Sequence, residues 1–177
     1  MEVYDAMKAR TSVRAYADTP VSDDSLERIL ESARISPSAM NYQPWHFVVV
    51  KDLEKRKAMS KARYAGFLKE SPVVVVGCGD KKRSPEWHVV DVTIAMQNMV
   101  MTATAEGLGT CWIGSFDEEL VRSVLKIPDH MEVVALLAVG HPRKKMNLLA
   151  TIARPKSRKR MSDIVSYEEY GCAEGRD

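Results

Sequence analysis

The clearest periodic pattern of apolar and polar positions lies between residues 26 and 33. Leu26, Ile29, Leu30 and Ala33 are spaced at i, i+3, i+4 and i+7, which is typical of the buried face of an amphipathic helix. Serine and aspartate residues that favour helix starts come just before them, at positions 22–24. A shorter pattern of the same kind predicts a helix over residues 3–10, and charged helices are expected over 53–68 and 118–127.

Continuous apolar runs predict the strands. Residues 46–50 read HFVVV, residues 72–78 read PVVVVGC and residues 132–140 read EVVALLAVG. The last two runs are typical of strands that are covered on both faces. A further short strand is expected over 110–116. Because helices and strands alternate, the predicted fold class is α+β in α/β/α layers, with a mixed central sheet flanked by helices.

The longest apolar segment, residues 89–105, contains a single charged residue, Asp91. It is shorter than the roughly 20 apolar residues that cross a bilayer, and Gln97 and Asn98 interrupt it. We therefore expect no membrane association but a nearly all-round buried helix, which packs against a second subunit as well as against its own sheet.

Composition and charge narrow the class of protein. A chain of 177 residues that is 45% hydrophobic suits one domain, or a domain that completes its core in an oligomer. We expect a single domain over residues 1–168 and a tail over 169–177. The three cysteines are far apart, which favours reduced thiols in the cytoplasm. The four histidines show no metal-ligand spacing, so no metal is expected, and residues 1–10 are not expected to be a signal peptide.

The segment before the first strand carries many hydrogen-bonding side chains. Residues 35–45 read ISPSAMNYQPW, and Pro37 and Pro44 fix this stretch as a loop. An ordinary connection from a helix to a strand has about 2–6 residues, so this one is long. It is either a plain connection or a loop whose amides read the edge of a planar ligand.

Two basic segments are candidates for binding a phosphate. Residues 8–14 offer three cations and the hydroxyls of Thr11 and Ser12, although a basic helix end is the simpler interpretation of this stretch alone. Between Val133 and Ser162 there are eight Lys or Arg residues and no Asp or Glu. That region is a solvated tail, a nucleic-acid-binding surface or part of a phosphate clamp. No aromatic residue lies near it for base stacking, and the net charge of only +2 gives no overall polyanion signal, so nucleic acid is not the expected partner.

Four motifs, taken together, resemble those of the FMN-dependent nitroreductase family. Residues 10–16 (RTSVRAY) are similar to its RxSxRxF opening, 37–45 (PSAMNYQPW) to its PSxxNxQPW loop, and 107–114 (GLGTCWIG) to its GLG-x-C-W-x-G segment. Residues 156–158 (KSR) resemble its C-terminal phosphate clamp. The motifs keep the family order over about residues 1–168. Tyr16 stands in place of the usual Phe, and residues 61–70 offer no counterpart of the asparagine that contacts the pyrimidine edge of the flavin.

The resemblance implies an interlocked homodimer with FMN at the interface and NADH or NADPH as electron donor. Arg10, Ser12 and Arg158 would hold the phosphate, and Arg14 would lie near N1 and O2 of the ring, where a cation favours reduced flavin. The loop would face the flavin of the partner subunit. The implied cofactor-binding residues are Arg10, Thr11, Ser12, Arg14, Pro37, Ser38, Ala39, Asn41, Gln43, Trp112, Ile113, Gly114, Lys156 and Arg158.

The implied activity is a ping-pong reduction of an electron-poor small molecule, of the nitroaromatic or quinone type. No side chain is assigned as a catalytic acid or base, and Cys111 is interpreted as a structural thiol. Two alternatives stay open. One is a flavin-dependent dehalogenase or a flavin-fragmenting enzyme of the same superfamily, and the other is a non-enzymatic module that binds anions or nucleic acid through its basic tail.

Overall fold

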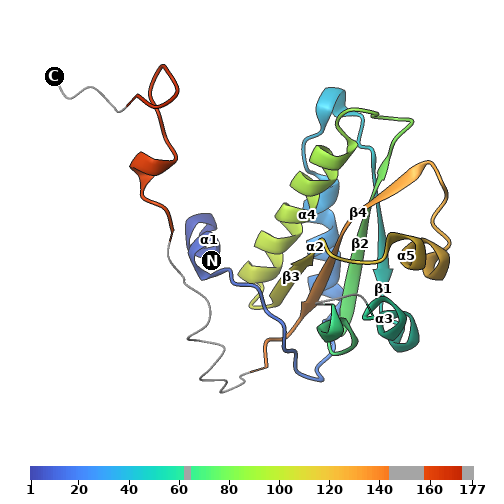
Figure 1. Ribbon diagram of the computed structural model, residues 1–177. Helices are drawn as coiled ribbons and strands as arrows, with labels where there is room; N and C mark the ends of the chain where they lie inside the picture. The colour runs from blue at the N-terminus through green and yellow to red at the C-terminus, as the bar shows by residue number, and fades with distance from the viewer. Residues whose placement is uncertain (62–64, 144–157, 173–177) are drawn as a thin grey trace. The chain divides into compact units, whose positions relative to one another are not determined.

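A computed structural model describes residues 1–61, 65–143 and 158–172 of the chain. It divides into two units, Met1–Lys144 and Lys145–Asp177, which are treated separately below. The first unit is built on a four-stranded sheet (Figure 1). In spatial order its strands are β1 (Trp45–Val50), β2 (Val73–Asp80), β4 (Met131–Gly140) and β3 (Gly109–Ile113), and each neighbouring pair is antiparallel.

Helices cover both faces of this sheet (Figure 1). One face carries α2 (Asp23–Arg34) and α4 (His88–Ala105), with α1 (Val3–Ala9) packed against α4, and the other carries α3 (Leu53–Met59) and α5 (Glu118–Leu125). Short 3-10 helices are η1 (Ala39–Asn41), η2 (Gly66–Lys69) and, in the second unit, η3 (Met161–Asp163). The layered α+β class is confirmed. Within the described ranges, the parallel component of the expected mixed sheet is limited to a bridge between Ser12 and Thr110.

The alternation of side chains along β2 places one core on each side of the sheet. Val73 and Val75 pack with α2 and α4, whereas Val74 and Val76 pack with α3 and α5. Each of these valines is at most 2% exposed, which confirms a strand covered on both faces. Full burial of such a side chain contributes roughly 1.5–3 kcal/mol, so the central strands anchor the unit.

Three helices begin at side-chain caps that the sequence supplies. Ser22, Asp52 and Asp117 each accept a hydrogen bond from a backbone N–H three residues later, at 3.2, 2.8 and 3.0 Å. Such caps satisfy N–H groups that have no partner in the first turn, and each contributes about 1 kcal/mol.

The charged helix predicted over residues 53–68 is shorter than expected, because α3 ends at Met59. Arg56 is buried, and its guanidinium donates to the backbone carbonyls of Lys51, Lys69 and Ser71. The chain must turn back to bring these carbonyls around one side chain, which a straight helix through residue 68 would prevent.

The nearly all-round buried α4 is confirmed on the side that faces the sheet, and burial of its outer face against a second subunit stays a prediction. Val92, Ala95, Met96 and Met99 lie in the core, but Val89, Val90 and Ile94 are 39%, 45% and 37% exposed on the outer face. The described part of the chain contains no helix that is long and apolar enough to cross a membrane. The outer face of α4 is therefore an apolar surface without a partner in the first unit.

Candidate functional site

Residues 10–14 lie along the outer edge of the sheet. Ser12 forms a parallel bridge with Thr110 on the edge strand β3, and the N–H of Val13 donates to the carbonyl of Thr110 at 2.8 Å. The hydroxyl of the buried Tyr16 donates to the carbonyl of Val13 at 2.7 Å. Burial raises the pKa of Tyr16, with a smaller contribution from Cys111, so this hydroxyl stays protonated and continues to donate. The segment is thus fixed to the sheet.

Gly109 permits this close approach. A Cβ at position 109 would lie 2.6–2.9 Å from the side-chain carbons of Val13, which is too close for any real contact. Only glycine lets residues 10–14 lie this near to β3. Sequence analysis assigned no such role to Gly109.

The cations of this segment are available to an anion. Arg10 is half-buried and Arg14 is exposed, and neither forms an ion pair within the described ranges. By contrast, Arg28, Arg34 and Arg143 each pair with a carboxylate. Unpaired guanidinium groups beside an exposed serine suit a phosphate.

The far end of β3 offers an open backbone surface. Trp112 is half-buried and Ile113 is buried, while Gly114 is exposed and has nothing within 4 Å of where its Cβ would lie. The main chain at Gly114 is therefore open to a flat ring. With residues 10–14, this stretch forms the β3-edge group of the candidate site.

The loop of residues 37–43 has a strained backbone and is stabilised by hydrogen bonds between its own residues. Met40, Asn41 and Gln43 adopt left-handed backbone conformations, with φ of 48°, 55° and 49°. Each such residue costs on the order of 1–3 kcal/mol and persists only where the surroundings enforce it. The hydroxyl of Ser38 accepts from the N–H of Gln43 at 2.9 Å, and the side-chain amide of Gln43 donates to Asn41 Oδ1 at 3.1 Å. Such strain is typical of functional loops.

Two contacts tie this loop to the rest of the fold. The N–H of Ala39 donates to Oδ1 of Asp91 on α4 at 3.1 Å, and the N–H of Asp80 donates to the carbonyl of Pro44 at 2.7 Å. Sequence analysis did not assign a role to Asp91. Its only signal was a lone charge within an apolar segment.

The β3-edge group and the loop lie at opposite edges of the sheet. Thr110 pairs with Val139, which pairs with Val73 of β2, whereas Trp45, just after the loop, pairs with Gly79 of the same strand. Val73 and Gly79 are six strand positions apart, or roughly 20 Å at about 3.3 Å per residue. Ile113, at the other end of the group, pairs with Leu136, which pairs with Val76, three positions or roughly 10 Å from Gly79. Moreover, β1 and β3 are the two outer strands. One subunit therefore does not bring the two groups together.

The C-terminal clamp stays a prediction. Lys156 lies outside the described residues, and Arg158 belongs to the second unit, whose position relative to the first is not described.

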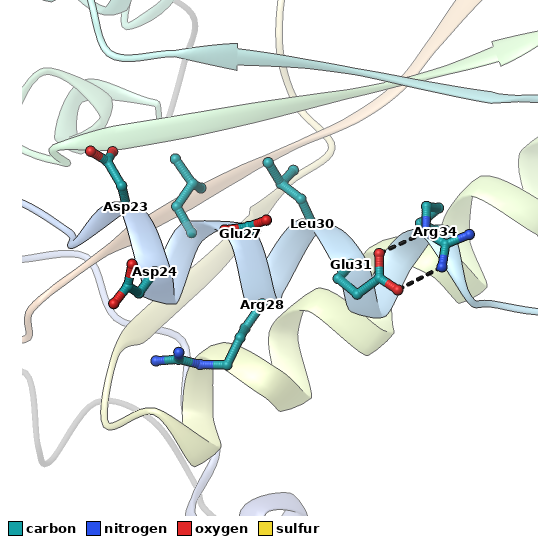
Figure 2. Close-up of a pocket in the computed structure, with 8 residues that line it drawn as sticks. Asp23, Asp24, Glu27, Arg28, Leu30, Glu31 and Arg34 are labelled. Carbon is teal, nitrogen blue, oxygen red and sulfur yellow. Dashed lines mark hydrogen bonds and ion pairs between the residues drawn. The ribbon is translucent and has the colours of Figure 1, made fainter.

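Hollows on the surface of the first unit lie elsewhere. One hollow, of about 780 Å³, is lined by residues of α2. Figure 2 shows these residues, among which Glu31 and Arg34 pair with each other. A second, of about 700 Å³, contains the ion pairs between Lys51 and Asp23 and between Arg143 and Glu70. Because these charges satisfy one another, we assign no ligand to either hollow. Within the described ranges, no group of three or more His, Cys, Asp or Glu residues is placed to hold a metal ion.

Comparison with known proteins identifies the family. The sequence model named Nitroreductase family matches residues 7–74 and 60–141. This chain belongs to the nitroreductase family. A protein of Archaeoglobus fulgidus, whose name joins NADH dehydrogenase and NAD(P)H nitroreductase, is 36% identical over 76% of this chain and 82% of its own length.

Solved structures of nitroreductases agree. A nitroreductase family protein from Clostridium difficile 630 superposes with a TM-score of 0.82 at 29% identity, over 96% of this chain and 99% of its own. An FMN-dependent nitroreductase from Clostridium difficile R20291 gives 0.74 at 29% identity, over 79% and 87%. The family predicted from the four motifs is thus confirmed, whereas the residue roles stay predictions.

Proposed function

We propose that this nitroreductase carries FMN and uses NADH or NADPH to reduce an electron-poor acceptor of the nitroaromatic or quinone type. The enzyme class and the cofactors agree with the names of its relatives, which include an NAD(P)H nitroreductase and an FMN-dependent nitroreductase. No disulfide links the three cysteines, which all lie in the described ranges, in line with a cytoplasmic setting. The acceptor rests on the family resemblance.

The residues at the β3 edge fit FMN. Arg10, Arg14 and the exposed Ser12 supply unpaired donors for a phosphate and for the polar edge of the ring. Gly114 leaves open space where a Cβ would otherwise block a flat ring. When bound, FMN supplies hydride transfer, and the protein supplies binding, orientation and electrostatics.

In the proposed mechanism, each part of the chain has a separate task. Arg10 and Ser12 would bind the phosphate. Arg14 would stabilise negative charge on the polar edge of the reduced ring, and the backbone at Ile113 and Gly114 would line the side of the ring that exchanges hydride. Ser38, Ala39 and Asn41 of the loop cover the ring in the site of the other subunit and restrict water there. No acid–base side chain is required.

The main structural support for this proposal is the separation between the loop of residues 37–43 and the β3-edge group within one subunit. The 18 residues of α4 span about 27 Å at 1.5 Å per residue. Its first turn holds the loop through Asp91, and its last residue, Ala105, is followed by β3 at Gly109. If the α4 helices of two subunits pack antiparallel about a two-fold axis, the loop of each meets the β3-edge group of the other.

The exposed apolar surface supports this dimer. Val89, Val90 and Ile94 on α4 are accompanied by Val3, Tyr4 and Met7 on α1, which are 67%, 71% and 55% exposed. Figure 1 shows α1 beside the C-terminal half of α4. Exposed apolar groups of this kind often mark an interaction surface, and a two-fold axis brings the same surface of both subunits together.

An absorbance spectrum of the purified protein tests the proposal. We expect the two visible bands of bound flavin, bleaching under anaerobic conditions with NADH or NADPH, and recovery of the bands with a quinone or nitroaromatic compound. Protein that neither carries nor binds FMN would refute the proposed function. Bleaching without recovery would refute the acceptor class.

A further inference from the structure

Asp91 is a buried carboxylate that the roles above do not explain. It lies in the first turn of α4 and is 3% exposed. Its Oδ1 accepts the N–H of Ala39, whereas Oδ2 is buried and has no hydrogen-bond partner in the described part of the chain. A buried carboxylate with so few partners is costly, and an apolar residue would fit its surroundings better.

An interaction with the helix dipole does not account for this position. An acidic side chain near a helix N-terminus is stabilising, but it has that effect while exposed, as Glu118 and Glu119 are on α5. Burial of Asp91 adds a desolvation cost that the dipole does not require. The hydrogen bond from the N–H of Ala39 does require a buried acceptor at this position, so it accounts for the burial of Asp91.

The loop of residues 37–43 needs such an attachment. Its internal bonds from Gln43 to Ser38 and Asn41 are exposed and local, so they fix the shape of the loop but not its place on the protein. Three left-handed residues store strain that would be released if the loop moved. The Asp91 bond fixes the loop at Ala39, and the backbone bond at Pro44 fixes its other end.

We infer that Asp91 is a positioning residue, which holds the loop in the conformation that covers the flavin ring in the partner's site. This inference rests on the proposed function and adds a residue to it. Asp91 acts through Ala39 and does not itself touch the cofactor. It governs contacts to the ring, whereas Arg10 governs contacts to the phosphate.

A comparison of FMN with riboflavin tests whether Asp91 affects contacts to the ring or contacts to the phosphate. FMN and riboflavin share the ring, but riboflavin lacks the phosphate. We expect Asp91→Ala to raise the dissociation constants of both flavins by a similar factor, about tenfold, as for the loss of one strong hydrogen bond. We also expect a shifted flavin absorption band and a changed reduction potential. Asp91→Asn keeps an oxygen acceptor for Ala39 and should recover most of both effects.

A second variant removes the same bond from the loop. Ala39→Pro deletes the N–H donor, and proline is tolerated at the first position of η1 because Ser38 before it is already extended. We expect Ala39→Pro to weaken both flavins as well, and the double variant with Asp91→Ala to be no worse than the more affected single variant. This cycle keeps the inference testable if Asp91→Ala folds poorly.

Asn98→Ala is the matched control. Asn98 lies two turns further along α4 and donates to Ser36 Oγ at 2.7 Å, so this variant removes a comparable bond to the segment just before the loop. It should leave the flavin spectrum unchanged. Wild-type protein that binds no flavin would refute the proposed function itself. Wild-type protein that binds flavin, with unchanged spectra and affinities in Asp91→Ala, or equal losses in the Ala and Asn variants, would overturn the positioning role.

Discussion

At the residue scale, Arg10 is predicted to bind the flavin phosphate. Arg10→Ala should raise the dissociation constant of FMN by roughly 10–100-fold, as for the loss of a hydrogen bond to a charged group, and should leave riboflavin binding unchanged. The effect should shrink at high salt because the lost interaction is screened. Fluorescence titration with both flavins at two salt concentrations measures this.

Arg34→Ala is the control for this prediction, because Arg34 pairs with Glu31 on the exposed face of α2. It should bind both flavins as the wild type does. Equal weakening of FMN and riboflavin in Arg10→Ala would contradict a phosphate contact.

Alanine substitutions at Gly109, Gly114 and Gly66 distinguish effects on stability from effects on flavin binding. In Gly109→Ala the new Cβ would collide with Val13, so we expect a loss of about 1–3 kcal/mol in the free energy of unfolding, with weaker FMN binding. Gly114→Ala meets no atom within 4 Å and should keep its stability, but its Cβ would occupy the space predicted for the ring. Urea denaturation and flavin titration measure the two effects separately.

Gly66→Ala is the control for these two variants, because its new Cβ also meets nothing within 4 Å. It should change the free energy of unfolding by less than about 0.5 kcal/mol and leave flavin binding intact. Full flavin binding by Gly114→Ala would show that the ring lies elsewhere.

The sequence predicted these residues unequally. Arg10, Ser12 and the loop were found because they belong to short motifs. Asp91 and Gly109 were missed because their partners, Ala39 and Val13, lie far away in sequence, and only the folded topology brings them together. A lone charge in an apolar segment is a weak signal by itself.

At the scale of elements, the start of α4 is tied to β4 by a histidine. His88 is buried, and its Nδ1 lies 2.8 Å from the Ser84 carbonyl and its Nε2 lies 3.0 Å from the Glu132 carboxylate, so both nitrogens donate when the ring is protonated. Burial opposes protonation, but the Glu132 carboxylate and the Ser84 carbonyl favour it more, and the pKa of His88 is raised.

This raised pKa makes the His88–Glu132 contact pH-dependent. Its contribution to stability is fully present below the ordinary histidine pKa of about 6.5 and is lost as the pH rises through the folded-state value. Glu132→Gln should therefore destabilise the protein more at pH 6 than at pH 9. Urea denaturation at both values measures the difference.

Glu27→Gln removes the same charge from the exposed face of α2 and should show no such trend. If Glu132→Gln cost the same at both pH values, the contact would not depend on a charged histidine.

The elements themselves were largely predictable. The bounds of α1, α2 and the four strands lie within a few residues of the patterns that predicted them, because periodicity and caps are local signals. The end of α3 was wrong because distant carbonyls around Arg56 determine it. The sequence did not predict which side of α4 meets the sheet and which is left for a partner, because an apolar composition does not distinguish the two sides.

At the scale of the whole molecule, the antiparallel order β1-β2-β4-β3 places the loop and the β3 edge at opposite edges of the sheet. Single-sequence patterns predict strands but not their order, so this separation became visible only in the structure. The proposed site therefore requires a dimer, because under the proposal the loop and the β3-edge group of one subunit belong to two different sites.

The dimer can therefore be tested together with the cofactor. Val90→Glu places a charge on the apolar face of α4, where Val90 is 45% exposed in the single chain. Burying that charge in an interface costs several kcal/mol, so the dissociation constant of the dimer should rise by roughly 100-fold or more. FMN should be lost at the same protein concentrations at which monomers appear in analytical ultracentrifugation.

Leu53→Glu on α3 is the control, because Leu53 is 43% exposed on the other side of the sheet, away from the proposed interface. It makes the same chemical change and should leave the dimer and the flavin intact. A Val90→Glu monomer that retains FMN with its wild-type spectrum would show that one subunit completes the site alone. That result would contradict the proposal that the loop and the β3-edge group of one subunit belong to different sites.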